Sequence, residues 1–133
     1  MKKNEQRTKN LTLRDIHVGD WVQCWIEPQK AYTGPVEVVE VRKGGVVCVV
    51  GGDGSLLQFD ASRVDELPMT DELAESFGFE YVTEYGAWVS PDGQLTFCDG
   101  HLYYCQNKLF GDCVSDLQEQ LYNQGYDPKF ELV

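Results

Sequence analysis

Short runs of alternating residues, separated by glycine-containing turns, constrain the fold of this chain more than any other feature. Residues 20–26 alternate with the period of two that a β-strand imposes. Val22, Cys24 and Ile26 then share the face directed to the core, opposite to Trp21 and Trp25. Further strands are expected over residues 36–42, 46–50 and 55–59. Because the turns between them are short and contain Gly and Asp, consecutive strands should pair as an antiparallel meander.

Two further elements complete the first half of the chain. Residues 60–64 predict a single helical turn with Asp60 as its N-cap, and residues 65–67 predict a short strand after it. Pro68 then interrupts the pattern. We therefore expect a small five-stranded β-barrel over residues 13–69, preceded by a flexible basic tail over residues 1–12, which lack periodicity.

The second half has a mixed pattern of helix and strand. Thr70 can cap a short helix over residues 71–77, with Gly78 as its end. Strands are expected over residues 79–82, 87–90, 94–98 and 101–105. Residues 112–124 place apolar side chains at helical spacing, with Gly125 as a stop signal. Residues 70–133 should therefore form an α+β module, in which one amphipathic helix packs on a three- or four-stranded antiparallel sheet.

Two resemblances add to this expectation. The opening Ile16-x-x-Gly19-Asp20-Trp21-Val22, with the meander and the one-turn helix, resembles SH3-like barrels, many of which begin with a Gly-Asp-x-Val strand. Most of the chain also resembles small uncharacterised proteins of gut bacteria and their phages or mobile elements. That second resemblance rests on Leu67-Pro68-Met69-Thr70-x-Glu72, Phe77-Gly78-Phe79 and Asp116-Leu117-Gln118-x-x-Leu121-Tyr122. The first implies an SH3-like barrel over residues 13–69, and the second implies no activity or catalytic residue.

Charge excludes one class of function. The 133-residue chain has a formal net charge of -11. Residues 1–10 carry four basic side chains and one acidic one, whereas residues 70–133 carry two basic and twelve acidic ones, a net charge of -10. Because such a surface repels phosphates, we expect no direct nucleic-acid binding by the folded body.

Cysteine use and hydropathy indicate a cytoplasmic protein. The five cysteines are an odd number at irregular spacing, which is not the even framework of a small secreted domain. Residues 1–10 lack the apolar run of a signal peptide, and no stretch of about 18 apolar residues could span a bilayer. We expect reduced thiols and no association with a membrane.

One pattern has metal-ligand character: Cys98, His101, Cys105 and Cys113, residue types that bind zinc when they converge as a tetrahedron. Cys98 and His101 flank a turn, but Cys105 should lie at the far end of the next strand. We therefore favour buried cysteines and a surface histidine, and expect neither a metal nor any other cofactor.

Catalytic arrangements are equally weak. His17 lies near Asp15 and Asp20, but in a segment that does not preorganise a site. The acids Asp71, Glu72 and Glu75 favour the dipole at the start of a helix rather than a pKa-raising pocket. Residues 51–54 (Gly-Gly-Asp-Gly) could be imagined as a phosphate cradle, but no helix or Lys-Ser/Thr pair follows them, so they predict a hairpin turn.

The two indoles on the first strand are the candidate interface. With Tyr32 in the following loop, Trp21 and Trp25 would form an apolar patch that needs cover. The cover could come from the second half of the chain, a second subunit or a foreign partner. We expect residues from 70 onward, or a second subunit, to cover at least one indole.

These features favour a non-enzymatic protein-interaction module, phage-related or carried on a mobile element, whose partner is an unknown protein or a second copy of the chain. The alternative is an acidic decoy, which would bind and inhibit a nucleic-acid-binding protein by imitating phosphate charge. An enzyme of unfamiliar design ranks last, because no catalytic set is visible.

Overall fold

The computed structural model describes residues 7–27, 29–50 and 53–133. The chain divides into two compact units, residues 1–67 and 68–133, each with its own sheet. The division comes two residues before the expected one. The α+β class is confirmed.

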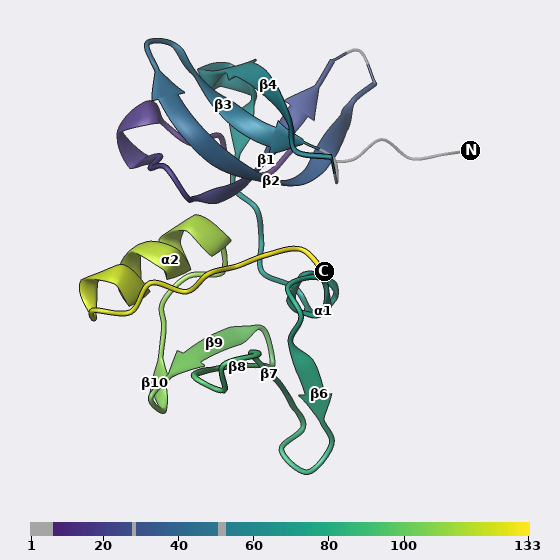
Figure 1. Cartoon of the computed structure of the whole chain (residues 1–133), viewed down its shortest axis with the longest axis vertical. Coiled ribbons are helices and arrows are strands. Elements are labelled where there is room, and N and C mark those ends of the chain that lie inside the picture. Colours follow the sequence, from purple (N-terminus) through teal and green to yellow (C-terminus); the bar gives the residue numbers. More distant parts are fainter. Residues whose placement is uncertain (1–6, 28, 51–52) are drawn as a thin grey trace. The chain divides into compact units, whose positions relative to one another are not determined.

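An antiparallel sheet with strand order β4-β3-β2-β1-β5 forms the N-terminal unit (Figure 1). Its strands are β1 (Trp21–Ile26), β2 (Ala31–Arg42), β3 (Gly45–Val50), β4 (Ser55–Asp60) and β5 (Val64–Asp65). Two 3-10 turns, η1 (Leu13–Asp15) and η2 (Ala61–Arg63), flank this meander. The pairing is that of an open sheet, with β4 and β5 at its edges.

The meander and the helical turn are confirmed. Asp60 caps η2, because its side chain accepts a hydrogen bond of 3.0 Å from the Ser62 amide. Within the expected turn 51–54, Gly51 and Gly52 lie outside the described residues, while Asp53 accepts a hydrogen bond from the Ser55 amide at 3.0 Å.

Strand β2 begins five residues before its expected start. The β1–β2 register shifts between Gln23 and Trp25, and the Cys24 amide donates to Thr33 Oγ1 at 3.2 Å. This irregularity carries the strand through Gly34, at φ 86°, which lies outside the expected strands. Strand β5 is also displaced, to Val64–Asp65 instead of 65–67.

The core of this unit lies on the expected face of the sheet. Val22 and Cys24 are fully buried, whereas Ile26 is only partly buried. The buried cluster comprises Leu11, Ile16, Val22, Cys24, Val36, Val38, Val46, Cys48 and Val64. The Cys24 and Cys48 thiols are neighbours in it, and the hydrogen bond with Cys48, together with burial, raises the pKa of Cys24.

The expectation of a frayed tail up to residue 12 is wrong for residues 7–11. Leu11 is buried in the core, and its amide donates to the Val64 carbonyl at 2.8 Å. Its neighbour Asn10 forms an antiparallel bridge with Asp65. The sequence could not indicate this, because the segment has no periodicity and its partners lie more than fifty residues away.

The C-terminal unit has a second antiparallel sheet, with strand order β10-β9-β8-β7-β6. Its strands are β6 (Glu80–Val82), β7 (Ala87–Val89), β8 (Leu95–Cys98), β9 (His101–Tyr104) and β10 (Asn107–Lys108). The prediction of three or four strands missed β10. Cys105 and Gln106 make the β9–β10 turn at φ 50° and 68°, a conformation usually signalled by Gly or Asn.

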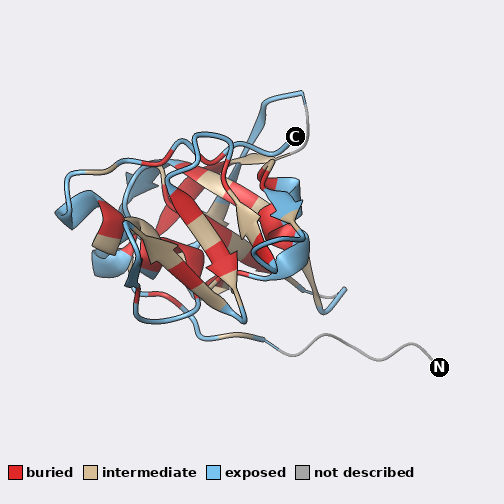
Figure 2. Ribbon diagram, turned by 90° about the horizontal axis from the view of Figure 1, so that it is seen from below, coloured by how far each residue is buried: buried red, intermediate tan, exposed pale blue. Residues whose placement is uncertain are grey.

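Two helices complete this unit. In α1 (Asp71–Ser76), the Thr70 hydroxyl accepts from the Leu73 amide at 3.1 Å, as expected of an N-cap. Helix α2 (Val114–Asn123) begins two residues later than expected and buries Val114, Leu117 and Leu121. Figure 2 shows buried residues within the strands and helices and exposed residues along the connections.

Candidate binding surfaces

The aromatic residues singled out from the sequence are largely covered. Trp21 and Trp25 are 6% and 5% exposed, and Tyr32 is partly buried. The Trp25 and Tyr32 rings meet edge to face, with centroids 4.9 Å apart, because the two residues are partners in the β1–β2 register. Trp21 lies opposite Glu37 on β2. The structure thus brings Trp25 and Tyr32 together and places Trp21 farther along β1.

Part of the cover of Trp25 comes from a residue assigned to the tail. The Arg7 guanidinium lies over the Trp25 ring, 5.6 Å from its centroid, in a cation–π arrangement. The indole Nε1 of Trp25 donates to Glu27 Oε1 at 2.8 Å. This cover comes from within the N-terminal unit, a source that the sequence did not indicate. That residues from 70 onward, or a second subunit, cover one of the indoles stays a prediction.

A buried carboxylate anchors Arg7. The Asp65 side chain is fully buried and accepts two hydrogen bonds from the Arg7 guanidinium, at 2.9 and 2.7 Å. The Tyr32 hydroxyl donates to it at 2.7 Å and the Asn10 amide at 3.2 Å. The hydrogen bond with Asp65 raises the pKa of Arg7, and burial raises the pKa of Tyr32. The hydrogen bonds from these neighbours compensate for the burial of the Asp65 carboxylate.

The backbone of residues 8–11 runs along β5. The Glu66 amide donates to the Lys9 carbonyl at 2.8 Å, which matches the bond from Leu11 to Val64 on the other side of the bridge. Thr8 Oγ1 donates to the Glu66 carbonyl at 2.6 Å. One edge of the sheet is therefore occupied by the chain itself.

The opposite edge is exposed. Strand β4 pairs with β3 and ends the sheet. Its side chains from Ser55 to Gln58 are all exposed, including Leu56 at 57% and Leu57 at 54%. Proteins usually protect such an edge with charges, proline or a very short strand. Over residues 55–59 this strand has no charge and no proline.

The C-terminal sheet carries a pocket on one face. It has a volume of about 480 Å³ and is lined by Gly93, Gln94, Thr96, Tyr103, Cys105 and Gln106. Thr96 and Tyr103 are cross-strand partners, and the two turns at the ends of the strands supply the rest. Its side chains are polar and uncharged, so the pocket offers hydrogen bonds and one aromatic ring but no catalytic pair.

Tyr126 connects the C-terminal segment to the second sheet. Its ring stacks on Tyr104, with centroids 4.8 Å apart, and its hydroxyl donates to Asp92. Burial and this hydrogen bond raise the pKa of Tyr126. Burial acts to raise the pKa of Asp92, but the hydrogen bonds from Tyr126, Gln94 and Ser90 together lower it.

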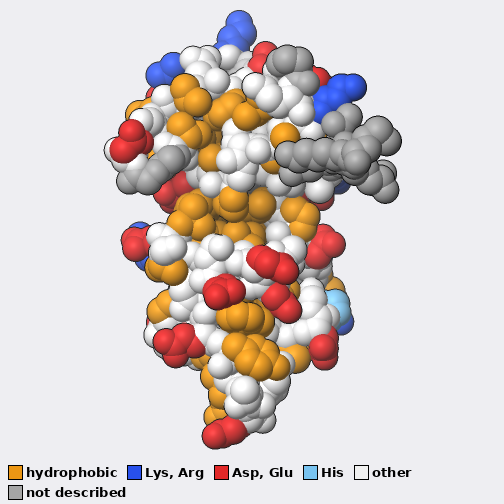
Figure 3. Space-filling view, turned by 90° about the vertical axis from the view of Figure 1, so that its right-hand side faces the viewer, with side chains coloured by type: hydrophobic (Ala, Val, Ile, Leu, Met, Phe, Trp, Pro, Cys, Tyr) orange, Lys and Arg blue, Asp and Glu red, His pale blue; other side chains and the backbone are white. Residues whose placement is uncertain are grey.

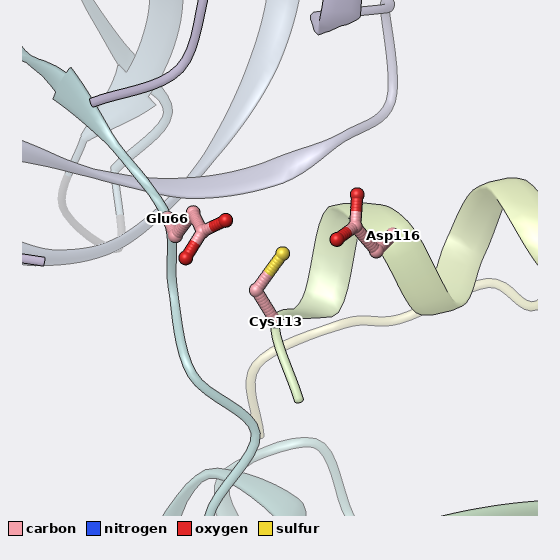
Figure 4. A group of neighbouring side chains, drawn as sticks. All are labelled: Glu66, Cys113 and Asp116. Carbon is pink, nitrogen blue, oxygen red and sulfur yellow. The ribbon is translucent and has the colours of Figure 1, made fainter. Parts of the chain in front are cut away.

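The four candidate metal ligands do not converge. Cys98 pairs with His101 at the β8–β9 turn, Cys105 lies in the β9–β10 turn, and Cys113 precedes α2. Within the described part of the chain, no three of their ligand atoms lie within 4.8 Å of one another. Figure 4 shows Cys113 directly before α2 and Asp116 in its first turn.

The residues considered for catalysis have structural contacts. Asp20 accepts a hydrogen bond from the His17 amide at 2.8 Å, while the His17 side chain is 62% exposed. Asp71 and Glu72 lie exposed in the first turn of α1, where they favour the helix dipole.

The acidity of the C-terminal unit lies on its surface. All twelve Asp and Glu residues of 68–133 are exposed, and that part of the chain has two basic residues, Lys108 and Lys129. Among residues 68–133, all of which the structure describes, no acid pairs with Lys or Arg. Figure 3 shows several of these carboxylates on one face of the unit.

Comparison with known proteins finds no matching family model, no matching curated protein and no matching solved structure. None of the helices in the described residues is both long and apolar enough to cross a membrane.

Sequence reasoning missed Arg7, Asn10 and Asp65. The only signal was the position of Asp65 directly after Val64, in a segment expected to be a strand, where a charge needs a partner. Nothing in the sequence indicated that the partner would be Arg7.

Proposed function

We propose that the protein is a non-enzymatic interaction module that binds a partner protein by strand addition at β4. The observation that carries this proposal is an edge strand that has no charge over residues 55–59 and exposes two leucines. Its outward backbone groups can pair with an extended segment, and Leu56 and Leu57 offer apolar contacts on opposite faces of the sheet. The chain uses the same mode of contact at its other edge, where residues 9–11 bind β5.

An SH3-like barrel is part of this proposal. The order β5-β1-β2-β3-β4, with a 3-10 turn before β5, supports it, as does the Gly19-Asp20 pair before β1. The cytoplasm is the proposed compartment, in keeping with five free cysteines.

The test is capture of partners from the native host, analysed by quantitative mass spectrometry, with the full chain and two variants. The double variant Leu56→Lys/Leu57→Lys places charge on the edge. Val18→Lys is the matched control, because Val18 is 67% exposed and lies outside β4. One stoichiometric partner should be retained by the wild type and the control and lost by the double variant. A stoichiometric partner that the double variant retains would contradict the proposal, provided that circular dichroism shows an intact fold.

The second candidate is an acidic decoy for a nucleic-acid-binding protein. Twelve exposed carboxylates in residues 68–133, without a basic partner among those residues, favour it. The two candidates differ in their response to salt, because contacts between exposed charges are largely screened at about 1 M ionic strength. A basic partner that is captured at about 0.15 M NaCl and lost at about 1 M, with no effect of the β4 substitutions, would favour the decoy.

A further inference from the structure

Residues 7–11 contact β5 as a bound extended peptide would. Their backbone makes two antiparallel hydrogen bonds with Val64 and Glu66, each 2.8 Å long. Bonds of this kind depend on an extended backbone and not on particular side chains. In recognition by strand addition they provide affinity, while pockets for alternate side chains provide specificity.

A specific set of contacts holds the first residue of the segment. Asp65 receives the Arg7 guanidinium in a bidentate arrangement, and the Ser62 carbonyl accepts a third hydrogen bond at 2.8 Å. The Trp25 ring lies under the guanidinium, with Tyr32 against Asp65. A planar, delocalised cation fits this set of contacts better than an ammonium does.

The remaining contacts involve two further residues of the segment, Thr8 and Asn10. Thr8 is engaged through both its amide, which donates to the Tyr32 hydroxyl at 2.6 Å, and its own hydroxyl. The Asn10 side chain donates to the Ala61 and Val64 carbonyls and to Asp65. The Arg7 side chain is 38% exposed and Lys9 and Asn10 are exposed, so the segment lies at the surface.

We propose that the β5 edge, with the side chains of Trp25, Tyr32 and Asp65, is a recognition site for an extended, arginine-containing segment of a partner protein. Leu11 holds the segment in the core, and the chain's own residues 7–10 occupy this site in cis. A partner segment with arginine at the first position and asparagine three residues later can replace them. The cis segment keeps the site closed, because a tethered ligand acts at an effective concentration on the order of millimolar.

The experiment uses the full chain with the side-chain anchors of the cis segment removed. The variant Arg7→Ala/Thr8→Ala/Asn10→Ala keeps Leu11 in the core and removes the side chains that contact Trp25, Tyr32 and Asp65. The probe is a fluorescent, amidated peptide of residues 7–10, which does not compete for the place of Leu11, and it is titrated by anisotropy. The variant should bind it saturably and at least about tenfold more tightly than the wild type does. Replacing the peptide arginine by lysine should weaken binding at least about tenfold, because the bidentate contact is lost.

A folded triple variant that does not bind the peptide, or that binds the lysine peptide equally well, would overturn the proposal. If the triple variant does not fold, the single variant Arg7→Ala decides the question. Methylguanidinium should then shift the NMR signal of the Trp25 indole N–H saturably, and methylammonium should not. Equal responses, or none, would also overturn it. These outcomes concern the β5 edge and leave the proposed function of β4 unaffected.

Discussion

Arg7→Ala should destabilise the N-terminal unit, although the sequence places Arg7 in a segment expected to be a flexible tail. The chain contains a matched comparison, because Arg7 and Arg42 each bind one carboxylate through two nitrogens. The distances are 2.9 and 2.7 Å for Arg7 with Asp65, and 2.8 and 3.1 Å for Arg42 with Glu40. The two pairs differ in burial, since the Asp65 side chain is fully buried and the Glu40 side chain is 51% exposed.

This difference sets the magnitude. Removing one partner of a buried ion pair costs about 3–5 kcal/mol, because the other charge stays buried without compensation. The cost should be smaller here, about 2 kcal/mol, since Asp65 keeps its hydrogen bonds with Tyr32 and Asn10 and Arg7 is partly exposed. Loss of the Arg42 pair should change stability little, because exposed pairs gain little Coulomb energy in water.

The assay is urea unfolding followed by tryptophan fluorescence. A Trp88→Phe background restricts the signal to Trp21 and Trp25, both in the N-terminal unit. In that background, Arg7→Ala should lower the free energy of unfolding by about 2 kcal/mol. Arg42→Ala is the control and should change the free energy of unfolding little. Equal effects of the two substitutions would refute the reasoning, because burial of the carboxylate would then not determine the strength of the pair.

Four further outcomes follow from the structure. In the native state an alkylating reagent should modify the exposed Cys105 first, and the three buried cysteines only after unfolding, as peptide mass spectrometry can measure. The pKa of Asp92 is lowered in the folded state, so its carboxylate stabilises the fold above its ordinary pKa of about 3.9. This stabilisation is lost as the pH falls through the lowered pKa. Asp92→Asn should therefore make the free energy of unfolding, measured by urea titration, less dependent on pH in acid. The raised pKa of Tyr126 gives the opposite pH dependence. The free energy of unfolding should fall as the pH rises above about 10, and it should fall less in Tyr126→Phe. Gly45→Ala should destabilise by about 1–3 kcal/mol in thermal unfolding, because the new Cβ would collide with the Phe59 carbonyl.

Elements with a strong local signal were predictable. The alternation over residues 20–26 places Val22 and Cys24 in the core, and both are fully buried. Asp60 and Thr70 cap their helical turns as their sequence positions indicated. These features depend on neighbours within a few residues, so the sequence contains what is needed to infer them.

Elements that depend on irregular backbone were not predictable. The β9–β10 turn places Cys105 and Gln106 at positive φ, where a sequence signal would have been Gly or Asn. The early start of β2 depends on a shift of register opposite Gln23 and Trp25, which no periodicity reveals. In both cases cross-strand pairing overrides local preference.

The candidate site at β5 was also predictable only in part. The sequence by itself determined a β-sheet first half with a meander, an α+β second half and the concentration of acid in that second half, and it singled out Trp25 and Tyr32 as candidate interface residues. Only the tertiary structure decided that Arg7 covers the Trp25 ring and pairs with Asp65 across 58 positions. Likewise, only the strand order shows that β4 is left as an exposed edge. The physical reason is that the strength of a charge pair, like the exposure of an edge, depends on what surrounds it in space, and burial is set by residues far away in the chain.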